Sequence, residues 1–152
     1  MKRPYIDKVT PAAWKSALTY NDAVYEAVQG HGISAAEREL IMVRVSQLNG
    51  CAYCLEAHTT AARDAGLTSQ QLDLLPAWRE TNIYDERMKA LLAVAEAGTR
   101  LPLTEDSLAD LAGALQTLGT EAFAAAELLT ATINMFNRVS ILSGHPVRER
   151  KN

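Results

Sequence analysis

Apolar residues recur at every third or fourth position along most of the chain, which is the spacing of one face of an α-helix. Glycine, proline and asparagine interrupt this pattern and mark where the periodic segments end. The pattern predicts an all-α fold of about six to seven helices in a single domain, with no linker. The expected helices cover residues 11–29, 35–49, 51–65, 68–75, 84–97, a segment that begins after Thr104, and 120–142.

Residues 34–49 are predicted to form the centre of this arrangement. Ser34 and Glu37 have the spacing of a capping box, which satisfies backbone N–H groups at the start of a helix. The segment that follows is apolar most of the way round over residues 40–48. Such a pattern is typical of a helix buried on all sides.

A weak internal echo relates this helix to the last one. Asn49 matches Asn137 and Val45 matches Ile133, both at an offset of 88 residues. Matches of this kind arise by chance among helical sequences and also in duplicated helical units. Both interpretations stay open.

Composition strengthens the helical prediction. Alanine and leucine, both strong helix formers, supply 44 of the 152 residues, whereas valine and isoleucine supply 14. A chain of this length can bury a full core without disulfides. We therefore expect one domain over residues 1–152 with its core at about 11–142, and a polar tail, 148–152, that frays.

Charge and hydropathy limit the partners of the chain. There are 15 basic and 18 acidic residues, a net charge of −3, which gives no broad attraction for nucleic acid. No apolar run reaches the roughly 18 residues of a membrane span, and residues 1–7 lack the apolar segment of a secretory signal. We expect a cytoplasmic protein with no nucleic-acid or membrane partner.

The two cysteines lie three residues apart and close to a histidine. On a helix, Cys51, Cys54 and His58 share one face over about two turns. The positive end of the helix dipole favours a thiolate at Cys51, and His58 is placed to act as a base one turn after Cys54. In a reducing cytoplasm, cysteines are more often catalytic or metal-binding than structural. The spacing indicates a redox centre.

Two other interpretations of this face stay open. Free thiols also pack as small core side chains. Zinc is the second alternative, although the face supplies three ligands where tetrahedral zinc takes four.

Elsewhere, His31 and His145 are isolated in loop-like sequence and are expected to be solvated or locally bonded. Arg44 is expected at the surface or an interface.

The segment from Glu39 through the apolar helix to Cys51-x-x-Cys54-x-x-x-His58 resembles the carboxymuconolactone decarboxylase family. The cysteine and histidine spacing is similar to that of its alkylhydroperoxidase D branch. The strong part of the resemblance covers about residues 11–97. Glutamate, paired cysteines and histidine together are specific, whereas Cys-x-x-Cys alone is a weak signal.

The resemblance implies an all-α bundle that assembles as a homo-oligomer, a trimer or a hexamer. It also implies an enzyme that reduces hydroperoxides and is recycled by an external dithiol, with no metal or bound organic cofactor. Cys54 would be the peroxidatic cysteine, and Cys51 the proton donor and resolving thiol that closes a Cys51–Cys54 disulfide. His58 and Glu39 would form the proton relay.

One position departs from the family pattern. Tyr53 stands where the alkylhydroperoxidase pattern has a histidine, and tyrosine, with a pKa of about 10, is a poor proton acceptor near neutral pH. The helix dipole and the resemblance also differ, because the dipole favours a thiolate at Cys51 while the family assigns the attack to Cys54. Both hold if Cys54 is buried beside His58 and Cys51 is exposed to the reductant. Tyr53 is expected at the pocket mouth or at a subunit contact.

Three other functions stay open. The cysteine pair is also compatible with a disulfide exchanger or redox sensor that has little peroxidase activity. A non-catalytic helical oligomer with packed thiols is the alternative outside redox chemistry. Lactone decarboxylation, which names the family, does not need two thiols, and the Cys-x-x-Cys pair counts against it.

Overall fold

The computed structural model describes residues 3–147 and 149, and within them the chain is helical, with no strand. The described residues form eight α-helices and one 3₁₀ helix: α1 (Ile6–Val9), α2 (Pro11–Gly30), α3 (Ala35–Asn49), α4 (Ala52–Asp64), α5 (Ser69–Leu74), η1 (Leu75–Glu80), α6 (Glu86–Ala97), α7 (Glu105–Leu118) and α8 (Thr120–Ser143). The prediction of a single all-α domain is confirmed, with slightly more helices than expected. Of the tail that is expected to fray, all but Glu149 lies outside the described residues.

Two short helices, α1 and η1, go beyond the prediction. Helix α1 has four residues, too few to show a period in the sequence. Pro76 lies in the first turn of η1, where a helix needs no N–H donor, so the proline that follows α5 also begins the next helix. Helix α8 is the longest, at 24 residues; none of the described helices has the length and apolarity to cross a bilayer.

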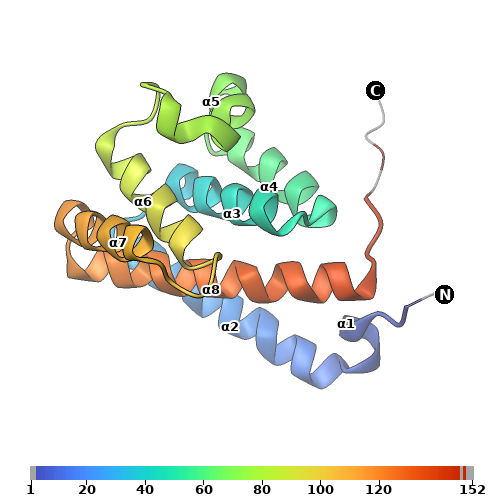
Figure 1. Ribbon diagram of the computed structural model, residues 1–152. Helices are drawn as coiled ribbons and strands as arrows, with labels where there is room; N and C mark the ends of the chain where they lie inside the picture. The colour runs from blue at the N-terminus through green and yellow to red at the C-terminus, as the bar shows by residue number, and fades with distance from the viewer. Residues whose placement is uncertain (1–2, 148, 150–152) are drawn as a thin grey trace.

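Helix α3 lies in the middle of the fold, where α4, α6 and α8 pack against it (Figure 1). Ser34 and Glu37 form the predicted capping box at its start. Every residue from Glu39 to Ser46 is buried, as the apolar pattern predicts. The helix contributes to two core clusters, one that includes Ile41, Leu91 and Leu129 and one that includes Leu40, Leu75 and Leu92. Burying one such side chain stabilises the fold by about 1.5–3 kcal/mol.

Asparagines join the end of α3 to α8. Asn49 Nδ2 donates to Asn134 Oδ1 and to Asn137 Oδ1, each over 2.9 Å. Asn137 in turn donates to Ser46 Oγ over 3.1 Å. Asn49 and Asn137 are the pair related by the offset of 88 residues, so two matched positions meet at the contact between the two helices.

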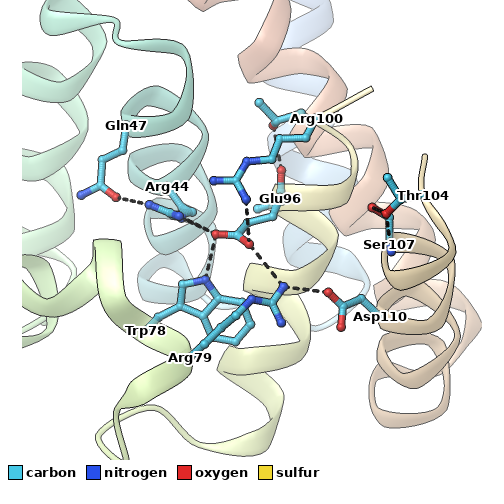
Figure 2. Close-up of polar contacts among 11 residues, drawn as sticks. Arg44, Gln47, Trp78, Arg79, Glu96, Arg100, Thr104, Ser107 and Asp110 are labelled. Carbon is cyan, nitrogen blue, oxygen red and sulfur yellow. Dashed lines mark hydrogen bonds and ion pairs between the residues drawn. The ribbon is translucent and has the colours of Figure 1, made fainter. Parts of the chain in front are cut away.

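A second polar cluster surrounds Glu96 of α6, away from the cysteines (Figure 2). Arg44 Nε and Trp78 Nε1 donate to Glu96 Oε1 over 2.9 and 3.0 Å. Arg79 and Arg100 lie 3.2 and 3.5 Å from the other carboxylate oxygen. The prediction for Arg44 is therefore wrong: it is only 6 % exposed, because Glu96 offers an opposite charge inside the chain.

Candidate functional site

The turn between α3 and α4 places both cysteines at the start of α4. Gly50 caps α3 in the left-handed conformation, with φ of +66°, which glycine adopts without steric cost. Cys51 is the N-cap residue of α4, and its Sγ accepts a hydrogen bond from the backbone N–H of Cys54 over 3.4 Å. Both thiols are free. The second cysteine therefore lies within the first turn, and His58 follows it one turn later.

Helices α3 and α4 bring Glu39 and His58 together. His58 Nδ1 lies 2.8 Å from Glu39 Oε2, and Arg38 Nε donates to Glu39 Oε1 over 3.0 Å. Glu39 is only 2 % exposed. Burial alone raises the pKa of this carboxyl, but hydrogen bonds and charge from His58 and Arg38 outweigh it and hold the pKa below the ordinary 4.5. Glu39 is thus an ionised, buried partner that fixes the imidazole of His58.

A pocket of about 550 Å³ opens beside His58, the member of this pair that lines it. Cys54, His58 and Tyr53 line it from α4, and Tyr53 is 45 % exposed. Most of the remaining wall is apolar or aromatic and comes from α2, α8 and the chain ends; it includes Trp14, Leu18, Tyr25, Ile133 and Phe136. The pocket is large enough for a small organic molecule beside the Cys54 thiol.

Cys51 is placed differently from the prediction. It is 1 % exposed and does not line the pocket, whereas Cys54, which is 5 % exposed, does. Burial, together with the neighbouring Cys54 thiol, raises the pKa of Cys51 from 9.0 to about 12, although the Cys54 N–H and Ser140 act in the opposite direction. The expectations of an exposed Cys51 and of a dipole-favoured thiolate there are wrong, because burial outweighs the helix terminus. Cys51 is a protonated thiol.

The described residues offer no set of ligands that supports the zinc alternative. Within residues 3–147 and 149, no group of three or more His, Cys, Asp and Glu side chains is arranged to hold a metal ion. The cysteines and His58 instead make contacts with protein groups, His58 with Glu39 and Cys51 with Cys54.

Three residues in or beside the site, Arg38, Tyr25 and Ser140, are not predicted from the sequence. The guanidinium of Arg38 lies 4.3 Å from the ring centroid of Tyr25 on α2, and Ser140 of α8 contacts the Cys51 thiol. Arg38 is adjacent to Glu39 in sequence, which is the one local hint. Nothing local marks Tyr25 or Ser140, since their places depend on how α2 and α8 pack.

The prediction for His145 is wrong. It is not solvated or locally bonded: its Nε2 lies 3.1 Å from Asp7 Oδ1, 138 residues away, and its ring lines the same pocket as Cys54. His31, in contrast, has a half-exposed side chain and lies 3.6 Å from Glu121. The difference arises because the segment before α2 and the segment after α8 meet beside α4, which no local pattern predicts.

Comparison with known proteins finds relatives that match most of the chain. Uncharacterized protein YdfG of Bacillus subtilis is 36 % identical over 113 residues, which cover 74 % of this chain and 77 % of that protein. The crystal structure of an Agrobacterium tumefaciens protein of unknown function, described as a candidate antioxidant defence protein AhpD, matches with a TM-score of 0.79 and 28 % identity. It covers 97 % of this chain and 100 % of that one.

Two shorter sequence matches are to proteins named as reductases. Alkyl hydroperoxide reductase AhpD of Nocardia farcinica is 46 % identical over 39 residues, 26 % of this chain and 22 % of that protein. The AhpD of Mycobacteroides abscessus is 44 % identical over 41 residues, 27 % of this chain and 23 % of that protein. These matches span less than a quarter of either reductase. The carboxymuconolactone decarboxylase family model matches residues 13–97, and the chain belongs to that family.

Proposed function

We propose that the protein is a thiol-dependent peroxidase that reduces organic hydroperoxides at Cys54. The observation that carries the proposal is the Glu39–His58 pair, 2.8 Å apart, at a pocket that the Cys54 thiol also lines. An ionised carboxylate holds the imidazole, the imidazole is a base one helical turn from the thiol, and the pocket admits the substrate.

In the first step, His58 accepts the proton of Cys54, and Glu39 stabilises the imidazolium that results. The Cys54 thiolate attacks the terminal oxygen of the hydroperoxide, an S–O bond forms and the O–O bond breaks. The sulfur is oxidised to a sulfenic acid and the peroxide is reduced to an alcohol once its alkoxide gains a proton.

In the second step, Cys51 resolves the sulfenic acid. Its sulfur attacks Cys54, a disulfide forms, and the Cys54 oxygen leaves with the Cys51 proton as part of a water molecule. The raised pKa of Cys51, about 12, suits this order of events, because a protonated Cys51 does not compete for the peroxide. An external dithiol then reduces the disulfide by exchange.

The similarity to antioxidant relatives supports the proposal, together with the resemblance of the cysteine segment to the alkylhydroperoxidase D branch. The same resemblance leads us to propose a homo-oligomer, a trimer or hexamer. Light scattering is expected to give three or six times the 16.6 kDa mass of the chain; the mass of one chain contradicts this assembly.

Steady-state kinetics with a small dithiol and tert-butyl hydroperoxide test the function. Cys54→Ser should abolish turnover, whereas Cys51→Ser, assayed without the dithiol, should consume about one equivalent of peroxide and then stop. Full turnover in Cys54→Ser overturns the proposal. Exchange with a model disulfide but no peroxide turnover in the native protein also overturns it, in favour of a disulfide exchanger.

A further inference from the structure

The pocket contains a second acid–base pair that the steps above do not use. His145 follows α8 and Asp7 belongs to α1, and both line the pocket with Cys54. His145 Nε2 lies 3.1 Å from Asp7 Oδ1. Their side chains are only 14 % and 12 % exposed, so the pair is part of the pocket wall rather than a surface contact.

The backbone and two aromatic rings hold His145 in place. Gly144 ends α8 in the left-handed conformation, with φ of +67°, and the N–H of His145 donates to the carbonyl of Ser140 over 3.1 Å. The imidazole then lies edge-on to Tyr5, with ring centroids 4.8 Å apart, and 5.3 Å from the ring of Tyr53, the residue before Cys54. These contacts fix the ring beside the thiol-bearing turn of α4.

The hydrogen bonding of the ring leaves one nitrogen for a substrate. Asp7 occupies Nε2, and among residues 3–147 and 149 no hydrogen bond holds Nδ1. Imidazole is the side chain that exchanges its proton near neutral pH. An imidazole oriented through one nitrogen by a carboxylate, with the other nitrogen free, has the arrangement of a general acid or base.

We propose that His145 is the general acid that protonates the alkoxide released from the hydroperoxide, a role that rests on the proposed function of Cys54. As the Cys54 sulfur bonds the terminal oxygen and the O–O bond breaks, the other oxygen takes the electron pair and the proton of the His145 imidazolium. Sulfenic acid, alcohol and neutral imidazole result. The two imidazoles then have different roles: His58 accepts the thiol proton, and His145 donates a proton to the leaving group. Asp7 is the positioning residue.

The charged and titratable groups around His145 come from α1, from the segment before it, where the Arg3 guanidinium also lies against Gly144, and from α4. Asp7 and Lys8 of α1 lie 3.3 Å apart, Tyr5 precedes α1, and Tyr53 belongs to α4. His58 and Cys54 line the same pocket from α4. Asp7 is the acidic side chain that contacts the imidazole, so its removal should change the orientation and charge of His145 more than any other single substitution.

The leaving group provides the test. tert-Butyl hydroperoxide releases an alkoxide, a strong base that needs a proton, whereas peracetic acid releases acetate, which leaves without one. The loss of the Cys54 thiol is measured in single turnovers by mass spectrometry for the native protein, His145→Gln, Asp7→Asn and the control His31→Gln. We expect His145→Gln to react at least tenfold more slowly with tert-butyl hydroperoxide and at the native rate with peracetic acid. This fits the about 10²- to 10⁴-fold contribution of a positioned acid.

Asp7→Asn should show the same pattern to a smaller degree, and His31→Gln should match the native protein with both oxidants. Native rates of His145→Gln with both oxidants overturn the proposal. Equal slowing with both also overturns it, because a damaged pocket does not distinguish leaving groups. A native Cys54 that reacts with neither oxidant contradicts the proposed function itself, and the role of His145 with it.

Discussion

At the scale of single residues, the site combines an ionised carboxylate and a protonated thiol, both almost fully buried. Glu39 keeps its charge because His58 and Arg38 contact its two oxygens. Cys51 keeps its proton because burial penalises the thiolate. The surroundings of each group therefore keep the Glu39 carboxyl deprotonated and the Cys51 thiol protonated.

Glu39→Gln keeps the shape of the side chain and removes its charge. We expect oxidation of Cys54 by peroxide to slow at least tenfold, because His58 loses the charge that stabilises its imidazolium. Glu96→Gln is a matched control, since it also alters a buried, multiply bonded carboxylate, at 7 % exposure, outside the pocket. Equal rates in Glu39→Gln and the native protein, measured in single turnovers, contradict the relay.

The pKa of Cys51 predicts a dependence of stability on pH. Its pKa rises from 9.0 to about 12 on folding, so between these values the unfolded chain loses a proton that the folded chain keeps. Stability due to this thiol is therefore present below pH 9 and is lost as the pH rises from about 9 to 12. Denaturant unfolding of the native protein and Cys51→Ala over this range should show a shallower decline in the variant; parallel curves refute the assignment.

The sequence predicts the redox face but not its surroundings. Periodicity alone groups Cys51, Cys54 and His58, since Cys51 is the N-cap of the helix that carries the other two. The burial of Cys51 depends on Ser140 and the packing of α8, and the place of His145 on a contact with Asp7 across 138 residues. Such contacts are set by tertiary packing, which leaves no local signature in the chain.

At the scale of elements, the α3–α4 turn determines how the carboxylate and the thiols face each other. Gly50 joins the two helices at φ of +66°. Helix boundaries around it are predicted within about two residues, because capping residues and glycines mark them. The helical period does not predict how α3 and α4 cross to bring Glu39 to His58. Only the family resemblance predicts that these two residues act together.

Gly50→Ala should therefore destabilise the fold by about 1 kcal/mol, the cost of a left-handed alanine. No atom beyond the two adjoining residues lies within 4 Å of the added methyl group, so the effect is conformational. Gly113→Ala, in the exposed middle of α7 with equal space around it, should stabilise the protein by about 0.5–1 kcal/mol instead. Thermal unfolding measures both; effects of the same sign contradict the role of Gly50.

At the scale of the whole molecule, the chain has two buried carboxylates, one that we assign to the reaction and one that we assign to stability. Glu39 contacts His58, which lines the pocket, whereas Glu96 joins α3, η1 and α6 through Arg44, Trp78 and Arg79 (Figure 2). Figure 1 shows α1 beside the end of α8, so the pocket wall also depends on the meeting of distant segments.

Glu96→Gln should lower the free energy of unfolding by about 3 kcal/mol, because it leaves buried arginine charge without its partner. For a chain of this size, that corresponds to a fall of about 10 °C in Tm. The rate of Cys54 oxidation well below Tm should not change. The exposed Glu127→Gln is the control for stability; an equal Tm in both variants contradicts the structural role of Glu96.

The central claim is that Cys54 reacts with hydroperoxide and Cys51 resolves the product. Mass spectrometry of the reduced protein after brief exposure to limited tert-butyl hydroperoxide, with a sulfenic-acid trap present, tests it most directly. We expect trapped sulfenic acid on Cys54 at the earliest times and a Cys51–Cys54 disulfide when the trap is omitted. Two unmodified thiols, or first oxidation at Cys51, would contradict it.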